Sequence, residues 1–181
     1  MNLLVDKEFE NLFTAFQKIA FRWERLESYR VNSEVEYFEY YIHKGVCLAD
    51  DCSNDWIKVV ENANRQGKAI QRVRLLPEEI GDYLRFEIDC GYIYSAEQGE
   101  KIYFIPQNIA NSLKNIPDYD FWLFDDKILV KMNYDNEGNF LGAEKIKNEH
   151  EIRKSLMAKN ALIKNSILFE EWIVKNRDWI V

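Results

Sequence analysis

The chain is poor in the residues that break or cross-link a fold: its 181 residues include 3 prolines, 7 glycines and 3 cysteines. Without glycine- or serine-rich stretches, a long flexible linker is excluded. No run approaches the roughly 18 consecutive apolar residues of a membrane-spanning helix, so we expect no membrane association. An odd number of cysteines is more typical of a reducing compartment than of a disulfide scaffold. We therefore expect a cytoplasmic protein.

Positive charge is also in short supply. The sequence carries 24 Lys and Arg against 31 Asp and Glu, a net charge of -7. This excludes nonspecific nucleic-acid binding, because such a surface must be cationic to displace counterions from phosphate.

Charged residues interrupt the first ten positions, so we expect no signal peptide. Hydrophobic residues make up 47% of the chain, which is enough for the core of one domain spanning 1–181.

The charge is uneven along the chain. Residues 1–55 carry a net charge of -5 and residues 77–100 a net charge of -6, but residues 56–76 between them carry +4. The basic segment contains Lys58, Arg65, Lys68, Arg72 and Arg74 against Glu61 alone. It either neutralises its acidic neighbours or forms a site for an anion, to which arginine presents a planar fork of donors.

Hydrophobic spacing predicts helices in the N-terminal part, residues 6–67. Apolar residues recur every three or four positions over 6–27, over 33–44 and from Asn54 or Asp55 to Gly67. Gly45 and Gly67 are typical helix stops. The C-terminal part, residues 148–181, has the same spacing with at most one break. Its Trp172 and Trp179, like the aromatic residues of the first helix, are more typical of a core than of a ligand cage. For part of the C-terminal helix, the alternative is a partner-docking surface.

The middle part, residues 68–147, predicts strands. Residues 68–76 read as a strand that ends at Pro77, which would open a helix running to Cys90. A short strand over 101–105 ends at Pro106. The apolar run 121–124 predicts a strand covered on both faces, and strands over 128–134 and 140–146 complete an antiparallel meander. The predicted fold class is α/β (mixed α+β), with N-terminal helices, a mixed sheet with a C-terminal antiparallel meander, and a C-terminal helix.

Three segments resemble an uncharacterised bacterial domain family. They are residues 71–76 followed by 82–87 (DYLRFE), residues 120–126 (DFWLFDD) followed by 132–135 and 138–144, and an opening motif of Phe21-Arg22-x-Glu24 with Tyr29. The family is catalogued as a domain of unknown function, is common in actinobacteria and is often encoded beside helix-turn-helix regulators. Two positions that are often His in the family are Tyr119 and Asn133 here, so chemistry that depends on those imidazoles would be absent.

The strand pattern also resembles, at the level of the fold alone, the phospholipase-D-like folds used as sensory domains in some bacterial regulators. Phospholipase-D catalysis requires His-x-Lys-x-x-x-x-Asp, in which the His is the nucleophile and the Lys binds phosphate. Neither His43 nor His150 begins such a motif. A related fold would therefore not carry that activity.

Charged residues of the family-like motifs form the strongest candidate site. On a strand, Arg72 and Arg74 project from one face, and on a helix Asp82 would align with Arg85. These residues either hold an anionic ligand or form a structural ion-pair network, because arginines on a covered strand need partners. The candidate ligand-binding residues are Arg72, Arg74, Tyr83, Arg85, Glu87, Trp122, Asp125 and Asp126.

No pattern favours a metal or a cofactor. Asn133 to Glu144 match the spacing of a calcium loop, but strand-like flanks favour a hairpin turn. The possible soft-metal ligands are His43, Cys47, Cys52 and Cys90, whose spacing is irregular for zinc. The sequence contains neither a glycine-rich phosphate loop nor a serine nucleophile elbow, and we expect no cofactor.

We therefore expect a binding or regulatory module rather than an enzyme, one that recognises a small anionic ligand or a protein partner such as a regulator. The alternative is an enzyme of phosphate or nucleotide chemistry in which Glu87, Asp125 or Asp126 acts as a base or a metal ligand. A third hypothesis, an acidic mimic of nucleic acid, is weaker because positive side chains are interspersed with the negative ones.

Overall fold

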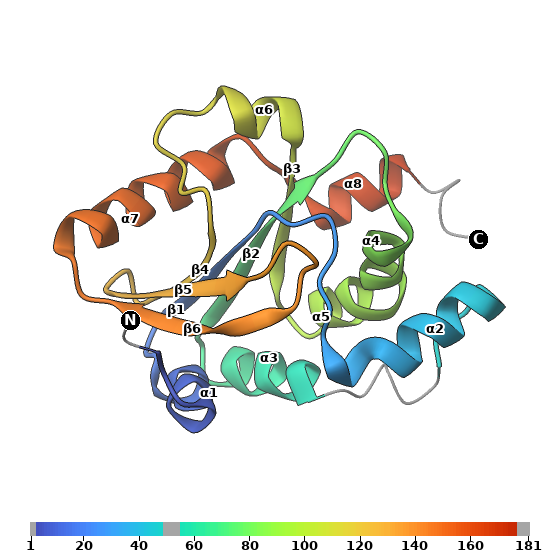
Figure 1. Ribbon diagram of the computed structural model, residues 1–181, viewed down its shortest axis with the longest axis horizontal. Coiled ribbons are helices and arrows are strands. Elements are labelled where there is room, and N and C mark those ends of the chain that lie inside the picture. Colours follow the sequence, from blue (N-terminus) through green and yellow to red (C-terminus); the bar gives the residue numbers. More distant parts are fainter. Residues whose placement is uncertain (1–2, 49–54, 177–181) are drawn as a thin grey trace.

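The computed structural model describes residues 3–48 and 55–176. They form a seven-stranded mixed sheet with the strand order β6-β5-β4-β1-β2-β3-β7 and helices on both faces (Figure 1). The predicted mixed α+β class is confirmed. In chain order the elements are α1 (Asp6–Ala15), β1 (Ile19–Glu24), η1 (Asn32–Glu34), α2 (Val35–Lys44), α3 (Asp55–Arg65), β2 (Ala69–Leu76), α4 (Asp82–Phe86), the π-helix η3 (Glu87–Tyr92), α5 (Ile93–Glu97), β3 (Lys101–Pro106), α6 (Gln107–Ser112), β4 (Asp120–Phe124), β5 (Ile128–Tyr134), β6 (Phe140–Ile146), α7 (Glu149–Lys164), β7 (Ile167–Leu168) and α8 (Phe169–Lys175).

The centre of the sheet is parallel and its outer parts are antiparallel. Strands β1, β2 and β3 run parallel, with Arg22 opposite Arg72 and Glu24 opposite Arg74. Strands β4, β5 and β6 form the predicted antiparallel meander, which joins the centre through the pairing of β4 with β1. Because β1 lies between β2 and β4, both of its edges are hydrogen-bonded.

Each face of the sheet has its own core. One core lies under α7 and includes Phe21 and Trp23. The other lies under α1 and α3 and includes Ala20, and Figure 1 shows α7 and α3 on opposite sides of the sheet. Side chains alternate between the two faces along a strand. Arg22 and Glu24 therefore point to the same face as Ala20, the face that α1 and α3 cover.

The prediction of a single helix over 6–27 is wrong, because α1 ends at Ala15 and β1 begins at Ile19. Over a few residues, the alternation of Phe21 and Trp23 is hard to distinguish from helical spacing. The turn between the two elements is held by Asp125, whose carboxylate accepts hydrogen bonds from the backbone N–H groups of residues 17, 18 and 19 at 2.8, 2.7 and 3.1 Å. That partner is distant in sequence and leaves no local signal.

The helix expected to open at Pro77 instead begins at Asp82 and continues past Cys90 to Glu97 as α4, η3 and α5. Gly81 is its N-cap, with extended backbone at ψ 167°. The residues from Pro77 to Gly81 therefore form a loop between β2 and α4. The helices predicted to end at Gly45 and Gly67 and the strands predicted over 68–76 and 101–105 are confirmed.

The C-terminal part contains the one expected break, at the short strand β7, which pairs with β3. Trp172 of α8 packs against Phe104 of β3, with ring centroids 4.9 Å apart, so it is a core residue. Trp179 lies outside the described residues. None of the helices in the described ranges is both long and apolar enough to cross a membrane.

Cys47 and Cys90 form a disulfide that joins the segment after α2 to η3 across 43 residues of sequence. The odd cysteine count favoured a reducing compartment over a disulfide scaffold, but these two cysteines are paired, so the count no longer argues for a reducing compartment. The count was misleading because pairing depends on which thiols the fold brings together. Cys52 lies outside the described residues.

Candidate functional site

Charged side chains of β1 and β2 meet on the face of the sheet that packs against α1 and α3. Arg22 and Glu24 belong to β1, and Arg72 and Arg74 belong to β2. Arg72 donates from Nη1 to Glu24 Oε1 at 2.7 Å and from Nε to Glu100 Oε1 at 2.8 Å. Arg22 Nε lies 3.3 Å from the same oxygen of Glu24. Glu24 thereby links the two strands through their arginines.

Further carboxylates complete this cluster. Asp120, at the start of β4, accepts from Arg22 Nη2 at 2.9 Å. Glu87, in η3, accepts from Arg74 Nη2 at 3.0 Å. Glu100 precedes β3 and is fully buried. We refer to Arg22, Glu24, Arg72, Arg74, Glu87, Glu100 and Asp120 as the buried charge network.

Aromatic residues supply additional partners to the network. Trp56 Nε1 donates to Glu100 Oε2 at 2.9 Å, and the Tyr92 hydroxyl donates to Glu24 Oε2 at 3.2 Å. The guanidinium carbon of Arg72 lies 5.7 and 5.3 Å from the ring centroids of Trp56 and Tyr92. Such contacts offset part of the cost of removing these charges from water.

Burial raises the pKa values of the carboxylates in the network, and the neighbouring arginines lower them. Burial raises the pKa of Glu24, but Arg72 and Arg22 outweigh burial and bring that pKa to about 2. Burial raises the pKa of Glu87 to about 7, because Arg74 offsets it only in part. The network therefore holds Glu24 ionised, whereas Glu87 exchanges its proton near neutral pH.

The predicted site residues converge only in part. Arg72, Arg74 and Glu87 belong to the buried charge network, where they bind other residues of the chain. Tyr83 of α4 lies nearby and donates from its hydroxyl to Glu34 Oε2 at 2.9 Å. The structure thus brings half of the predicted set to one region.

The predicted aspartates are at the other end of β4. Asp120 begins this strand, and Asp125 and Asp126 follow its last residue. Asp125 caps the turn before β1, and Asp126 accepts from Lys159 of α7 at 2.7 Å. These two carboxylates do not meet the arginines of β2.

The two remaining candidates have other surroundings. Arg85 Nε donates to the backbone carbonyl of Ile80 at 3.4 Å. Trp122 packs edge-on against Phe13 of α1 at 4.9 Å between ring centroids, and the guanidinium carbon of Arg22 lies 5.8 Å from its ring. Trp122 therefore belongs to the core beside the buried charge network.

Sequence reasoning missed the members of the network from β1 and β4. The signal that could have identified them is their place in the family-like motifs. Arg22 and Glu24 belong to the motif Phe21-Arg22-x-Glu24, and Asp120 is the first residue of the DFWLFDD motif. A helix over 6–27 would have put Arg22 and Glu24 on different sides of that helix, because residues two apart do not face each other there. In a strand they share a face, and Arg22 then reaches Asp120.

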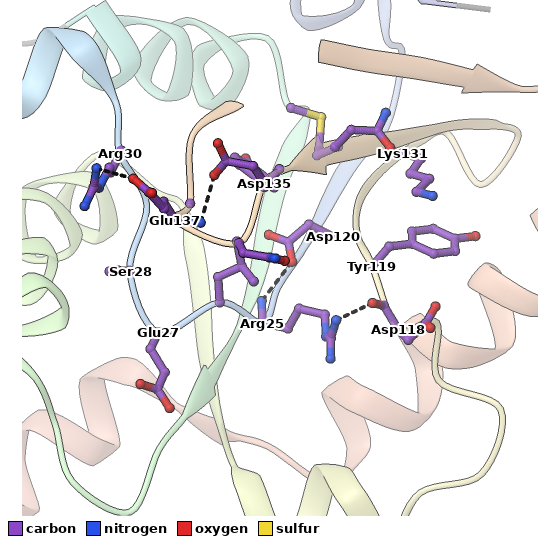
Figure 2. Close-up of a pocket in the computed structure, with 16 residues that line it drawn as sticks. Arg25, Glu27, Ser28, Arg30, Asp118, Tyr119, Asp120, Lys131, Asp135 and Glu137 are labelled. Carbon is purple, nitrogen blue, oxygen red and sulfur yellow. Dashed lines mark hydrogen bonds and ion pairs between the residues drawn. The ribbon is translucent and has the colours of Figure 1, made fainter. Parts of the chain in front are cut away.

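Several pockets adjoin this region, and two of them contain charged side chains that bear on function. The larger, about 830 Å³, lies between the segment after β1 and the β5–β6 hairpin (Figure 2). We call it the hairpin cleft. The smaller, about 250 Å³, lies beside η3 and includes Arg72, Glu87 and Glu100 in its lining. We call it the network pocket.

Arg25, Tyr119 and Lys131 lie on one side of the hairpin cleft, and Arg30 and Glu137 lie on the other (Figure 2). Arg30 Nη1 is paired with Glu137 at 2.8 Å. Arg25 donates to a backbone carbonyl of the segment before β4, and the ammonium of Lys131 lies 5.0 Å from the ring centroid of Tyr119. Within the part of the chain that the structure describes, neither the Arg25 guanidinium nor the Lys131 ammonium forms an ion pair with a carboxylate.

The two positions where the resembled family often has histidine, Tyr119 and Asn133, both line the hairpin cleft. The Tyr119 hydroxyl donates to Glu151 at 3.4 Å, and Asn133 Nδ2 donates to a carbonyl of β6 at 3.2 Å. His43 and His150 are exposed on α2 and at the start of α7. Besides Leu26, Ser28 and Met132, the side chains that line the cleft are cations, carboxylates, amides and phenols.

Across residues 3–48 and 55–176, no three His, Cys, Asp or Glu side chains gather in a way that could hold a metal ion. The calcium-like spacing over 133–144 belongs to the β5–β6 hairpin, where the Asp135 carboxylate accepts from Asn139 Nδ2 at 2.8 Å. Cys47 and Cys90 of the possible zinc set are joined to each other.

Comparison with known proteins supports the fold and identifies the family. The crystal structure of a phospholipase D family member, Nuc from Salmonella typhimurium, is similar with a TM-score of 0.50 and 9% identity, over 88% of this chain and 86% of that chain. At this identity the likeness shows the fold alone. No curated protein matches the chain. The model of the family described as domain of unknown function DUF6879 matches residues 7–174, and the chain belongs to that family.

Proposed function

We propose that the chain is a binding module that recognises a small anionic ligand in the hairpin cleft. The observation that supports this function is the pair of Arg25 and Lys131, two cations at one cleft whose side chains form no ion pair with a carboxylate among residues 3–48 and 55–176. The arginines of the buried charge network each bind a carboxylate instead. Cations without a counter-ion at a cleft are the groups that an anion binds through charge-assisted hydrogen bonds.

The lining of the cleft restricts the ligand further. The ammonium of Lys131 rests on the ring of Tyr119 and keeps its N–H donors for a ligand. Five carboxylates also line the cleft. Asp120 and Glu137 are paired with Arg22 and Arg30, and Asp135 accepts from Asn139. Glu27 and Asp118 form no ion pair within the described residues and would repel a polyanion. A ligand with a single anionic group and several hydroxyl or amino groups fits this mixture best, because the carboxylates can accept hydrogen bonds from those groups.

The position of the cleft also favours ligand binding. It adjoins the carboxyl end of β1, and the carboxyl ends of parallel strands are where sheets of this kind commonly bind ligands. The proposed role is regulatory: a partner protein would distinguish the occupied cleft from the empty one. Neither the ligand nor the partner requires a catalytic step.

Isothermal titration with inorganic phosphate and glucose 6-phosphate tests this function. We expect the double variant Arg25→Ala/Lys131→Ala to weaken binding by about tenfold or more, because each lost charge-assisted hydrogen bond is worth about 1.5–3 kcal/mol. The control Lys58→Ala/Arg65→Ala removes two exposed cations of α3 and should bind like the wild type. Unchanged binding by the first variant, or no binding of either probe to the wild type, would overturn the proposal.

The enzymatic alternative has one observation in its favour. Of the three acidic residues proposed for it, Glu87 lines a pocket and has a pKa of about 7, which suits a general base. Asp125 and Asp126 are bound elsewhere in the fold. If the wild type hydrolyses p-nitrophenyl phosphate and Glu87→Gln does not, while both remain folded, the enzymatic function replaces the binding function.

A further inference from the structure

We propose that the network pocket is a second ligand site, one that binds a small organic cation such as a primary amine or a guanidinium compound. This site is distinct from the hairpin cleft, since the two pockets share no lining residue. The basic strand β2 suggested an anion site here, but its arginines are already bound to carboxylates. The charges that remain available in the pocket have the opposite sign.

The buried charge network has more carboxylates than arginines. Its cations are Arg22, Arg72 and Arg74, and its anions are Glu24, Glu87, Glu100 and Asp120. With every group ionised, one negative charge lacks a counter-charge inside the protein, where such a charge is costly. A proton or a bound cation can supply the missing positive charge.

The available carboxylate oxygen is that of Glu87. Its Oε2 accepts from Arg74 at 3.0 Å, whereas no donor from the described residues reaches its Oε1. The Glu87 side chain is 12% exposed and lines the pocket. The neighbouring Glu100 uses both oxygens, one for Arg72 and the other for Trp56. A donor on a ligand would therefore bind Glu87 Oε1.

The walls of the pocket suit an organic cation. Trp56, Phe86 and Tyr92 line it, and the rings of Trp56 and Tyr92 already lie against the guanidinium of Arg72. Aromatic faces attract cations through their quadrupole. The volume of about 250 Å³ is below the roughly 300–1,000 Å³ of drug-sized ligand sites, so the ligand is small. The one arginine in the lining, Arg72, is already bound to Glu24 and Glu100, so it offers no free positive charge to an anion.

The ionisation of Glu87 agrees with this assignment. Burial raises its pKa to about 7 even though Arg74 opposes the shift, as expected for a carboxylate without a full counter-charge. A cation bound at Oε1 supplies that charge and favours the ionised carboxylate. Such a site takes its ligand from water only if the new contacts exceed the cost of desolvating the cation.

Titration calorimetry with n-butylammonium and agmatine tests the site, with n-butanol and acetate as neutral and anionic comparisons. We expect the two cations to bind the wild type, and acetate and n-butanol not to bind. Glu87→Gln should weaken cation binding by about tenfold to a hundredfold, the range of a lost hydrogen bond to a charged group. Trp56→Leu should also weaken it. Glu97→Gln, an exposed glutamate of α5, should leave it unchanged.

A second measurement does not depend on the variants. In the wild type, nuclear Overhauser effects should connect the butyl protons of the probe to the rings of Trp56 and Tyr92. The proposal is overturned if neither cation binds, if Glu97→Gln and Glu87→Gln bind equally well, or if the contacts map to other aromatic rings. Because Arg25→Ala/Lys131→Ala leaves this pocket intact, failure here is distinguishable from failure of the anion-binding function.

Discussion

Arg72 Nη1 donates to Glu24 Oε1 at 2.7 Å, from β2 to the neighbouring parallel strand β1. The contact joins β2, which the sequence predicts as a strand, to β1, which its local spacing predicts as part of a helix. Because Glu24 also meets Arg22 on its own strand, one carboxylate contacts two arginines in the middle of the sheet, and Asp120 and Glu100 supply the further negative charge. The stability of the sheet should therefore depend on these charges.

Replacing Arg72 by Met should lower the free energy of unfolding by about 3–5 kcal/mol, because it leaves Glu24 and Glu100 without a main counter-charge in a buried site. Urea denaturation measures the change. The control Arg65→Met breaks a 2.6 Å pair with Glu61 in which the arginine is 70% exposed, and should cost less than about 1 kcal/mol. Equal losses in the two variants would contradict the structural role of the network.

The ionisation of Glu87 should make stability depend on pH. Its pKa is raised from 4.5 to about 7 in the folded protein, so between these values the folded state binds more protons than the unfolded state. The contribution of Glu87 to the free energy of unfolding therefore falls as pH rises through this window, and it is constant above it.

Urea denaturation across that pH range checks this expectation. Glu87→Gln should remove the part of the decline that Glu87 causes, whereas Glu97→Gln should follow the wild type. The contribution of Glu24 to the free energy of unfolding has the opposite pH dependence, because its pKa of about 2 in the folded protein lies below the ordinary value of 4.5. This contribution is lost as the pH falls between these two values. A wild-type pH profile retained in Glu87→Gln would contradict the assignment.

Replacing Asp125 by Ala should lower the free energy of unfolding by about 2 kcal/mol, since three backbone N–H groups at the start of β1 lose a charged acceptor. Phosphate binding at the hairpin cleft should not change, because Asp125 follows the opposite end of β4. The control Asp55→Ala removes a carboxylate that is 97% exposed and should change stability by less than about 0.5 kcal/mol. Lost ligand binding in a stable Asp125→Ala protein would instead support a direct role.

Reduction of the Cys47–Cys90 disulfide should lower the free energy of unfolding by about 4 kcal/mol, the loop-closure value for a separation of 43 residues. Denaturation with and without dithiothreitol measures this difference. The variant Cys47→Ser/Cys90→Ser should show the lower stability in both conditions, because it has no such bond to reduce. A dithiothreitol effect of the same size in this variant would place its cause elsewhere.

Much of the architecture could be predicted because its signals are local. Gly45 and Gly67 end α2 and α3 with positive φ angles of 69° and 70°, a conformation that glycine adopts without strain. The meander over 120–146 follows from an apolar run, alternation and a turn. Strand β1 could not be predicted from spacing, because its strand character depends on pairing with β2 and β4, 50 and about 100 residues away along the chain.

For the candidate site too, only the features that depend on local geometry could be predicted from the sequence. That Arg72 and Arg74 share a face follows from the geometry of any strand, and the structure confirms it. Their partners could not be deduced, because they come from β1, from η3 and from the residue before β3. Arg22 and Asp120 are 98 residues apart in sequence and 2.9 Å apart in space.

The sequence by itself determined the fold class, the DUF6879 family motifs and the basic strand between two acidic segments, because composition, periodicity and short motifs are properties of the chain alone. Only the tertiary structure decided where those charges lie. Burial in the sheet requires each arginine of β2 to find a carboxylate nearby, and the fold supplies Glu24, Glu87 and Glu100. In the function that we propose, an anionic ligand binds Arg25 and Lys131 instead, at a cleft formed by segments that meet only when the chain folds.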